Sequence, residues 1–234
     1  MNAFDSSIIS FLNDFAGHWK TFDELIVFIS ESPLIKGGPI VACLWWLWFR
    51  PASDGPGRRD YVVATVLTGA AAVIVGRGVS TALWFRERPI ADASQHFVMP
   101  YSFTGADLGS WSSFPSDHAV LFFSLCMGIF LAHRRAGIAA FAWTVIVISF
   151  PRMYLGLHWP TDLIAGAALA IPLAWIGTAR IIRETIRDRL LPWAESSPAL
   201  FYAGMSIVMF EVTNLFDDGH DALHVLSHAA KSIL

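Results

Sequence analysis

Charged residues are scarce in this chain. Asp, Glu, Lys and Arg make up 15% of its 234 residues, whereas about a quarter is usual for soluble domains. The formal net charge of -3 excludes the generally basic character of a nucleic-acid-binding protein, so no nucleic-acid partner is expected. Hydrophobic residues reach 55%, ten tryptophans are present, and several stretches carry no charge. This combination indicates a membrane protein with membrane lipids around it.

Cysteine is almost absent as well. Cys43 and Cys126 both lie in apolar stretches, which favours buried small hydrophobes over a disulfide framework or a metal site. The N-terminal region carries Asp5, Asp14 and Lys20 and lacks a basic start followed by an apolar stretch. We therefore expect no cleavable signal peptide.

Six apolar stretches approach the length of about 20 residues that a membrane-spanning helix needs. They lie at about 33–49, 61–85, 117–133, 137–151, 160–181 and 198–216. The predicted fold is all-α: a polytopic membrane protein whose catalytic domain, residues 33–216, is a six-helix transmembrane bundle. Residues 1–32 have helix-like apolar spacing and predict two amphipathic helices at the membrane interface, with a further partial span as the alternative. Residues 217–234 form a C-terminal tail.

The placement of arginine predicts the orientation of these spans. Arginines occur between spans one and two, three and four, and five and six: Arg50, Arg58, Arg59, Arg134, Arg135, Arg180, Arg183, Arg187 and Arg189. These three connections would lie on one side, which the positive-inside rule makes cytoplasmic. The N-terminus, the 86–116 loop, the 151–160 connection and the tail then face outward from the cell (inner) membrane, toward the periplasm or exterior.

Three polar clusters fall on that outer side. Their sequences are Phe-Arg-Glu-Arg-Pro at 85–89, Phe-Pro-Ser-Asp-His at 114–118, and Pro-Arg-Met-Tyr-Leu-Gly-Leu-His-Trp-Pro-Thr-Asp at 151–162. Arginines bind phosphate oxygens through several donors, and a serine at a helix start lies where the helix dipole attracts anions. One histidine could attack phosphorus while another protonates the leaving oxygen. The four-residue spacing of His158 and Asp162 would place both on one helix face, where the carboxylate could orient the ring.

Each cluster also has a simpler interpretation. Arg86 and Arg88 could be interfacial side chains that reach toward water. The segment 115–117 could be an ordinary helix cap, and His158 could belong to an aromatic belt beside Trp159. The phosphate-site hypothesis is favoured because three independent coincidences on one membrane face are otherwise required.

Together the clusters resemble the signature of the type-2 phosphatidic acid phosphatase family, the lipid phosphate phosphatases. The family pattern is lysine-x6-Arg-Pro, then Pro-Ser-Gly-His, then Ser-Arg-x5-His-x3-Asp. Arg88-Pro89 matches the first motif and residues 115–118 match the second, with the Pro-Ser-Asp-His variant seen in bacterial undecaprenyl diphosphate phosphatases. Arg152, Gly156, His158 and Asp162 match the third with its spacing.

The resemblance implies roles for these residues. His158 would be the nucleophile that becomes phosphohistidine, Asp162 would orient it, and His118 would protonate the leaving oxygen and then activate water. The phosphoryl oxygens would be bound by four groups: Arg88, Arg152, Ser116 and the backbone N–H of Asp117. The scheme requires no cofactor and no metal. The substrate it implies is a lipid phosphate or diphosphate, with an undecaprenyl-type diphosphate preferred.

The chain departs from the family pattern at three positions. Thr81 stands where the lysine should be, Pro151 replaces the serine of the third motif, and Asp117 replaces the glycine of the second. Thr81 cannot supply a positive charge, so either Arg77 or Arg86 would have to compensate, or phosphate binding would be weaker.

Several alternatives remain open. The motifs bind the phosphate and not the tail, so they do not separate the preferred substrate from phosphatidic acid or phosphatidylglycerol phosphate, nor hydrolysis from phosphotransfer to another lipid. A non-catalytic lipid-binding or transport protein is the alternative from another class, with Arg77 and Glu211 as the charges inside spans. In the tail, His220, His224 and His228 repeat every four residues, which fits an amphipathic helix or a divalent metal site. The sequence leaves the oligomeric state unknown.

Overall fold

The computed structural model describes residues 2–51, 58–105 and 112–215. This part of the chain is built from helices joined by turns and extended segments, without strands. The helices are α1 (Ala3–Asn13), α2 (Lys20–Glu31), α3 (Pro33–Phe49), α4 (Arg59–Ala82), α5 (Asp117–Ala132), α6 (Arg134–Trp143), α7 (Phe150–Tyr154), α8 (Pro160–Gly177), α9 (Arg180–Arg189), α10 (Leu191–Ser196) and α11 (Pro198–Thr213). The all-α prediction therefore holds for the described residues.

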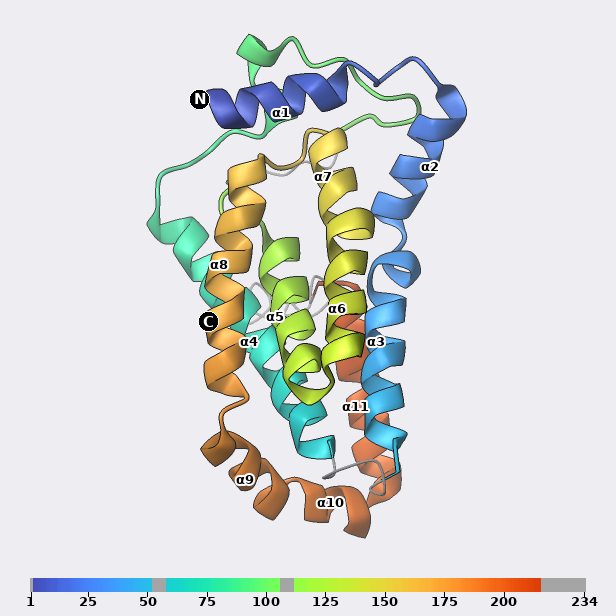
Figure 1. The fold of residues 1–234 in the computed structure, drawn as a ribbon, viewed down its shortest axis with the longest axis vertical. Helices are drawn as coiled ribbons and strands as arrows, with labels where there is room; N and C mark the ends of the chain where they lie inside the picture. Colours follow the sequence, from blue (N-terminus) through green and yellow to red (C-terminus); the bar gives the residue numbers. More distant parts are fainter. Residues whose placement is uncertain (1, 52–57, 106–111, 216–234) are drawn as a thin grey trace, which may run out of the picture.

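Helix α5 is the centre of the bundle. Its side chains Leu121, Leu125 and Ile129 are completely buried, and it packs against α4, α6 and α8 (Figure 1). Gly166 allows α8 to come close to the start of α5, because a Cβ at this position would lie 2.7 Å from the Ala119 Cβ and 2.9 Å from the Ser116 carbonyl oxygen. The close contact holds together the ends of two helices that carry motif residues.

Among the described residues, three helical segments are long and apolar enough to cross a membrane: α4, the continuous run Arg134–Tyr154, and α8. A fourth candidate exists if α2 and α3, which meet at 53°, form one bent span. Helices α5 and α11 are apolar but shorter. Each of the six predicted stretches thus contains a helix, although the second ends at Ala82 and the fifth is interrupted after Gly177. By length and composition, three or four of these segments can span a membrane.

Large apolar side chains point outward from these helices. Ile74 of α4, Trp175 of α8 and Ile207 of α11 are each exposed by about two thirds or more, at 73%, 65% and 65%. So many apolar side chains facing water would be unfavourable. They indicate that lipid surrounds the bundle, as in a chain that crosses the membrane several times.

The fourth predicted stretch is longer than the sequence suggested. It was expected at 137–151, but the helix runs from Arg134 to Tyr154, with a π-helical segment Thr144–Ser149 between α6 and α7. Pro151 lacks an N–H and is normally disruptive inside a helix. Here it is the second residue of α7, just after the π segment, and is tolerated there, so Arg152 is placed on the last helical turn.

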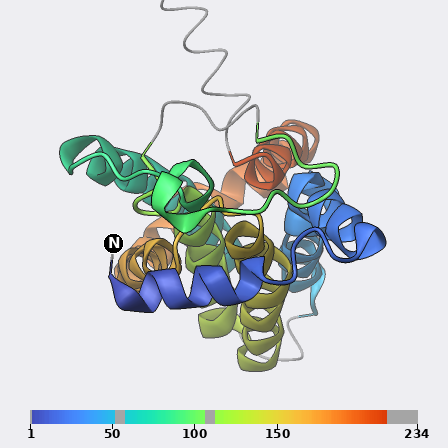
Figure 2. The same ribbon diagram turned by 90° about the horizontal axis from the view of Figure 1, so that it is seen from above.

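The two N-terminal helices form as predicted, but each buries some of its polar side chains. Helix α1 buries Asp5 and Asn13, and α2 buries Asp23, while Phe11 and Phe28 are exposed. Asn13 exchanges hydrogen bonds with the backbone of Val98, at 2.8 and 2.7 Å. Helix α1 lies across one end of the bundle, where it packs against α7 and α8 (Figure 2).

The opposite end is closed by α9 and α10 (Figure 1). The sequence predicted only a connection here, because four arginines gave it no apolar stretch. Arg183 and Arg187, one helical turn apart, both bind the buried carboxylate of Asp60 at the start of α4, at 3.1 and 2.7 Å. This arginine-rich end is far from the end that α1 covers.

Candidate active site

The three motif segments meet beneath α1. The backbone N–H of Ser113 donates to the carbonyl of Arg86 at 2.9 Å, and that of Ser116 donates to the carbonyl of Asp162 at 3.2 Å. Arg88 donates through Nη1 to the carbonyl of Leu157 at 3.0 Å. The end of α7, the starts of α5 and α8, and the extended strand-like segment after α4 thus share one site.

His158 lies in the tight turn between α7 and α8. Gly156 makes this turn possible, because its φ of +65° is strained for other residues and an added Cβ would lie 2.7 Å from the Phe97 ring. Nδ1 of His158 lies 2.9 Å from the carbonyl oxygen of Ser113. A carbonyl only accepts, so Nδ1 carries the proton and Nε2 is the basic, nucleophilic nitrogen.

The electrostatic surroundings keep His158 neutral. The ring is 6% exposed, and burial lowers the pKa of His158 below its ordinary value of 6.5. Asp162 opposes this shift, while Arg88 and Arg152 add to it. An imidazole that stays neutral near pH 7 is the form required for nucleophilic attack.

Asp162 lies beside His158 without a direct hydrogen bond to it. Its Oδ2 is 3.8 Å from Nδ1 of His158, because α8 begins at Pro160 and not before His158. The same oxygen accepts from the backbone N–H of Trp159 at 2.8 Å, and Oδ1 accepts from Arg86 at 2.5 Å. The expected orienting hydrogen bond is made by the Ser113 carbonyl, while Asp162 contributes nearby negative charge.

His118 and Arg152 are in direct contact. Nη2 of Arg152 lies 2.6 Å from Nε2 of His118 and also donates to the carbonyl of Ser30 at 3.3 Å. Because a guanidinium only donates, Nε2 of His118 is the acceptor here. The two histidines also interact electrostatically with each other, so the structure brings both rings to one cluster of arginines.

Ser116 is the N-cap of α5. It is completely buried, and its hydroxyl accepts from the backbone N–H of Ala119 at 3.4 Å. Asp117 follows at the first helical position, where backbone N–H groups are not used by the helix. This end of α5 therefore has the donors and the dipole that attract an anion.

Arg88 carries a donor that fits an anion. Its Nε is buried and has no hydrogen-bond partner within the described structure. A buried N–H without a partner is costly. Burial also lowers the pKa of Arg88, although Asp117 and Asp162 counteract it. A phosphate oxygen would satisfy this guanidinium.

Both arginines proposed to compensate for the family lysine, Arg77 and Arg86, are bound to carboxylates in this structure. Arg77 pairs with Asp117 at 3.3 Å and donates to the carbonyl of Leu215 at 3.4 Å. Arg86 binds two carboxylates, as described below. Thr81 is exposed, and its hydroxyl donates back to the carbonyl of Gly78 at 2.9 Å.

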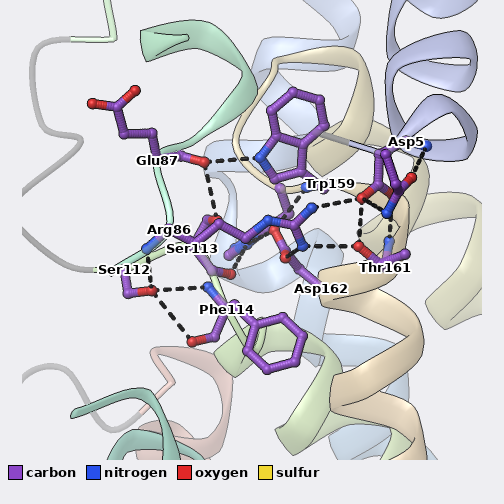
Figure 3. A network of polar contacts seen from close by, with 11 residues as sticks. Asp5, Arg86, Glu87, Ser112, Ser113, Phe114, Trp159, Thr161 and Asp162 are labelled. Carbon is purple, nitrogen blue, oxygen red and sulfur yellow. Dashed lines mark hydrogen bonds and ion pairs between the residues drawn. The ribbon is translucent and has the colours of Figure 1, made fainter. Parts of the chain in front are cut away.

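Sequence reasoning missed three contributors to the site. Ser113 acts through its backbone carbonyl, for which a sequence carries no signal. Asp5 belongs to α1, about 80 residues from the nearest motif, yet it is bound to Arg86 and Thr161 (Figure 3). Lys36 of α3 acts electrostatically on His118. For Asp5, the sequence offered one signal: a carboxylate among the apolar residues of an amphipathic helix.

Part of the predicted polar surface lies outside the described residues. This applies to positions 106–111 of the long polar loop and to the tail with His220, His224 and His228. The metal-site alternative for that tail stays a prediction.

Comparison with known proteins agrees with this geometry. The profile of the PAP2 superfamily matches residues 59–185, which include all three motifs. The undecaprenyl-diphosphatase BcrC of Bacillus subtilis is 24% identical over 72% of this chain and 80% of its own length. The bacitracin transport permease protein BcrC of Bacillus licheniformis is 26% identical over 78% and 88%, and the lipid A 1-diphosphate synthase of Escherichia coli is 27% identical over 82% and 81%.

No solved structure matches the chain. The superfamily profile, however, covers more than half of the sequence and contains the histidines, arginines and carboxylate that the fold brings together. This chain belongs to the PAP2 superfamily and is a lipid phosphate phosphatase.

Proposed function

We propose that the protein hydrolyses a polyprenyl diphosphate of the undecaprenyl type, at the outer face of the cell membrane, through a phosphohistidine intermediate. The observation that carries the proposal is the hydrogen bond between Nδ1 of His158 and the Ser113 carbonyl, which makes Nε2 the nucleophile. Support for the substrate comes from the similarity to the undecaprenyl-diphosphatase of Bacillus subtilis over most of both chains.

In the proposed first step, Nε2 of His158 attacks the terminal phosphorus. A P–N bond forms while the bond to the bridging oxygen breaks, and His118 gives its proton to the departing lipid monophosphate. In the second step, His118 takes a proton from water, the water oxygen attacks phosphorus, and the P–N bond breaks to release inorganic phosphate. The charge on the phosphoryl oxygens would be stabilised by four groups: Arg88, Arg152, Ser116 and the N–H of Asp117.

The contact between Arg152 and His118 gives phosphate binding a second role. His118 has to leave the guanidinium and gain a proton on Nε2 before it acts as an acid. Phosphate oxygens attract the guanidinium of Arg152, and their negative charge favours the imidazolium form of His118. Substrate binding thereby prepares the acid.

We propose the membrane arrangement on the same grounds. Six spans would be formed by α2–α3 together, α4, α5, the run 134–154, α8 and α11, with the shorter α5 and α11 packed against protein neighbours. The arginine-rich end with α9 would be cytoplasmic. Helix α1 and the site would then lie at the outer interface, where a lipid diphosphate presents its head group.

The test is phosphate release from purified protein. The panel includes polyprenyl diphosphate, phosphatidic acid and phosphatidylglycerol phosphate, with vanadate as a competing phosphate mimic. We expect the diphosphate to have the highest kcat/KM of the panel. We also expect the His158→Ala and His118→Ala variants to lose at least about 100-fold in kcat while they remain folded in the membrane. Full turnover by a folded His158→Ala variant would refute the nucleophile assignment.

A second candidate is phosphoryl transfer to another lipid. The observation that favours it is the similarity to the lipid A 1-diphosphate synthase of Escherichia coli, over more than four fifths of both chains. Adding an acceptor lipid that carries one phosphate, with radiolabel on the terminal phosphate of the donor, separates the two. Hydrolysis places the label in inorganic phosphate, whereas transfer places it in the acceptor.

A further inference from the structure

Helix α1 reaches the site through one buried carboxylate. Asp5 is completely buried, and its Oδ2 accepts from Nη2 of Arg86 at 2.6 Å and from the hydroxyl of Thr161 at 2.6 Å. Its Oδ1 accepts from the backbone N–H of Thr161 at 2.9 Å. Asn2, the N-cap of α1, holds the same carboxylate through its amide at 3.0 Å. Both oxygens of Asp5 are therefore fixed.

The guanidinium of Arg86 lies between two buried carboxylates (Figure 3). Its Nη2 binds Asp5, and its Nη1 binds Asp162 at 2.5 Å and the hydroxyl of Thr161 at 2.8 Å. It is also placed over the ring of Trp159, at 5.5 Å from the ring centre. The Arg86 side chain is only 14% exposed and both carboxylates are at 0%, so solvent screens these charges poorly.

The count of charges matters for His158. Two carboxylates share one guanidinium, which leaves one net negative charge in this group. Asp162 is the member that lies next to the nucleophile, with Oδ2 3.8 Å from Nδ1 of His158. If Asp5 were replaced by a neutral residue, the positive charge of Arg86 would be balanced by Asp162 only. The negative charge beside His158 would then be weaker.

We propose that Asp5 is a positioning residue for the phosphatase reaction: it fixes Arg86 and Thr161 so that Asp162 stays beside His158 with part of its negative charge uncompensated. This inference rests on the proposed role of His158 as the nucleophile. The ring gains positive character as the P–N bond forms, and a nearby negative charge stabilises that state. The N-terminal helix α1 would thus act on the chemistry through Arg86 and Asp162.

A purely structural role for Asp5 makes a different prediction, and the chain offers a matched control. Asn13 anchors the other end of α1 to Val98 and has no contact with Arg86. If α1 matters only as a tether, Asn13→Ala and Asp5→Asn should have the same effects. If the charge and geometry of Asp5 matter, only Asp5→Asn should change the chemistry.

The experiment compares the wild type with Asp5→Asn, Asp5→Glu and Asn13→Ala. We measure phosphate release from polyprenyl diphosphate in detergent across pH and the melting temperature of each variant. Asp5→Asn should lower kcat by about 10- to 100-fold with less change in KM. It should also move the acid midpoint to lower pH, because losing a negative charge disfavours the imidazolium of His158. The other charged groups around His158 are Arg88, Arg152, His118 and Asp162, and all are unchanged in these variants.

Asp5→Glu should recover part of kcat, and Asn13→Ala should melt earlier while its kcat and acid midpoint stay those of the wild type. The inference fails if folded Asp5→Asn keeps the kcat and the acid midpoint of the wild type, or if Asn13→Ala changes both equally. A histidine 15N titration reads the protonation of His158 without turnover, with His158→Gln to assign the signal. A wild type without phosphate release would sink the proposed function, while a shift of His158 in Asp5→Asn would still support the positioning effect.

Discussion

At the scale of single residues, the burial of His158 determines how activity should depend on pH. Burial and the charges of Arg88 and Arg152 lower the pKa of His158 below 6.5, and Asp162 opposes this shift without cancelling it. With the neutral ring as the proposed nucleophile, activity should persist as pH falls to 6.5 and be lost only below it. We expect the acid midpoint of kcat/KM below 6.5.

A lipid phosphate titrates as well, so the profile is to be measured on a diphosphate and on a monophosphate. A midpoint that is the same for both substrates belongs to the enzyme. A shared midpoint clearly above 6.5 would contradict a nucleophile kept neutral by burial.

Lys36 is our candidate for the positive charge that Thr81 cannot supply. It is half-buried in the first turns of α3, and it acts electrostatically on His118. A charge-assisted contact with a phosphate contributes about 1.5 to 3 kcal/mol. Lys36→Met should therefore lower kcat/KM by about 10- to 100-fold.

The control for Lys36 is Lys20→Met, which removes an exposed lysine paired with Glu24 on α2. Lys36→Arg should retain most activity, because it keeps the charge. Equal activity of the Lys36→Met and Lys20→Met variants would rule out a role for Lys36 in phosphate binding.

The residues of the site divide into those that sequence could and could not predict. His118, His158 and Arg152 belong to local motifs with fixed spacing, so the sequence predicts that they act together. Asp5 and Lys36 contribute single charges from elements far along the chain. Their roles depend on how α1 and α3 pack, and no local spacing carries that information.

At the scale of helices, the contact between α5 and α8 should control the geometry of the site. Gly166→Ala would place a Cβ against the backbone of Ser116, which cannot move independently of α5. Such overpacking costs about 1 to 3 kcal/mol and should separate Ser116 from Asp162. We expect lower thermal stability together with reduced kcat.

Gly204→Ala on α11 is the matched control, since an added Cβ there meets nothing within 4 Å. A helical Gly→Ala change without steric conflict should leave stability equal or slightly higher. If Gly166→Ala behaved like Gly204→Ala in stability and in kcat, close packing of α5 and α8 would not be required.

Four helices begin where the apolar stretches of the sequence begin. The starts at Pro33, Asp117, Pro160 and Pro198 agree with the predicted ones to within a residue. The prediction was wrong where a local rule was overridden, as at Pro151, which the π segment accommodates. It also missed α9, because Arg183 and Arg187 bind the buried carboxylate of Asp60, and this residue is distant in sequence.

At the scale of the whole molecule, the separation of charge along the bundle predicts a single orientation in the membrane. One end carries α9, whose arginines bind Asp60 or are exposed, and the other carries the site beneath α1. The positive-inside rule places the arginine-rich end in the cytoplasm. Phosphate would then be released on the outer side.

Labelling of single cysteines tests this orientation in intact cells. In a background with Cys43→Ser and Cys126→Ser, Ser94→Cys should react with a membrane-impermeant maleimide, because Ser94 is exposed at the end that is predicted to face outward. Thr185→Cys on α9 is equally exposed and should react only after the membrane is permeabilised. The reverse pattern would place the site in the cytoplasm. In that reverse case, the cysteine-free enzyme should hydrolyse only those diphosphate lipids whose head groups lie in the inner leaflet. The side of labelling and the side of phosphate release must therefore agree.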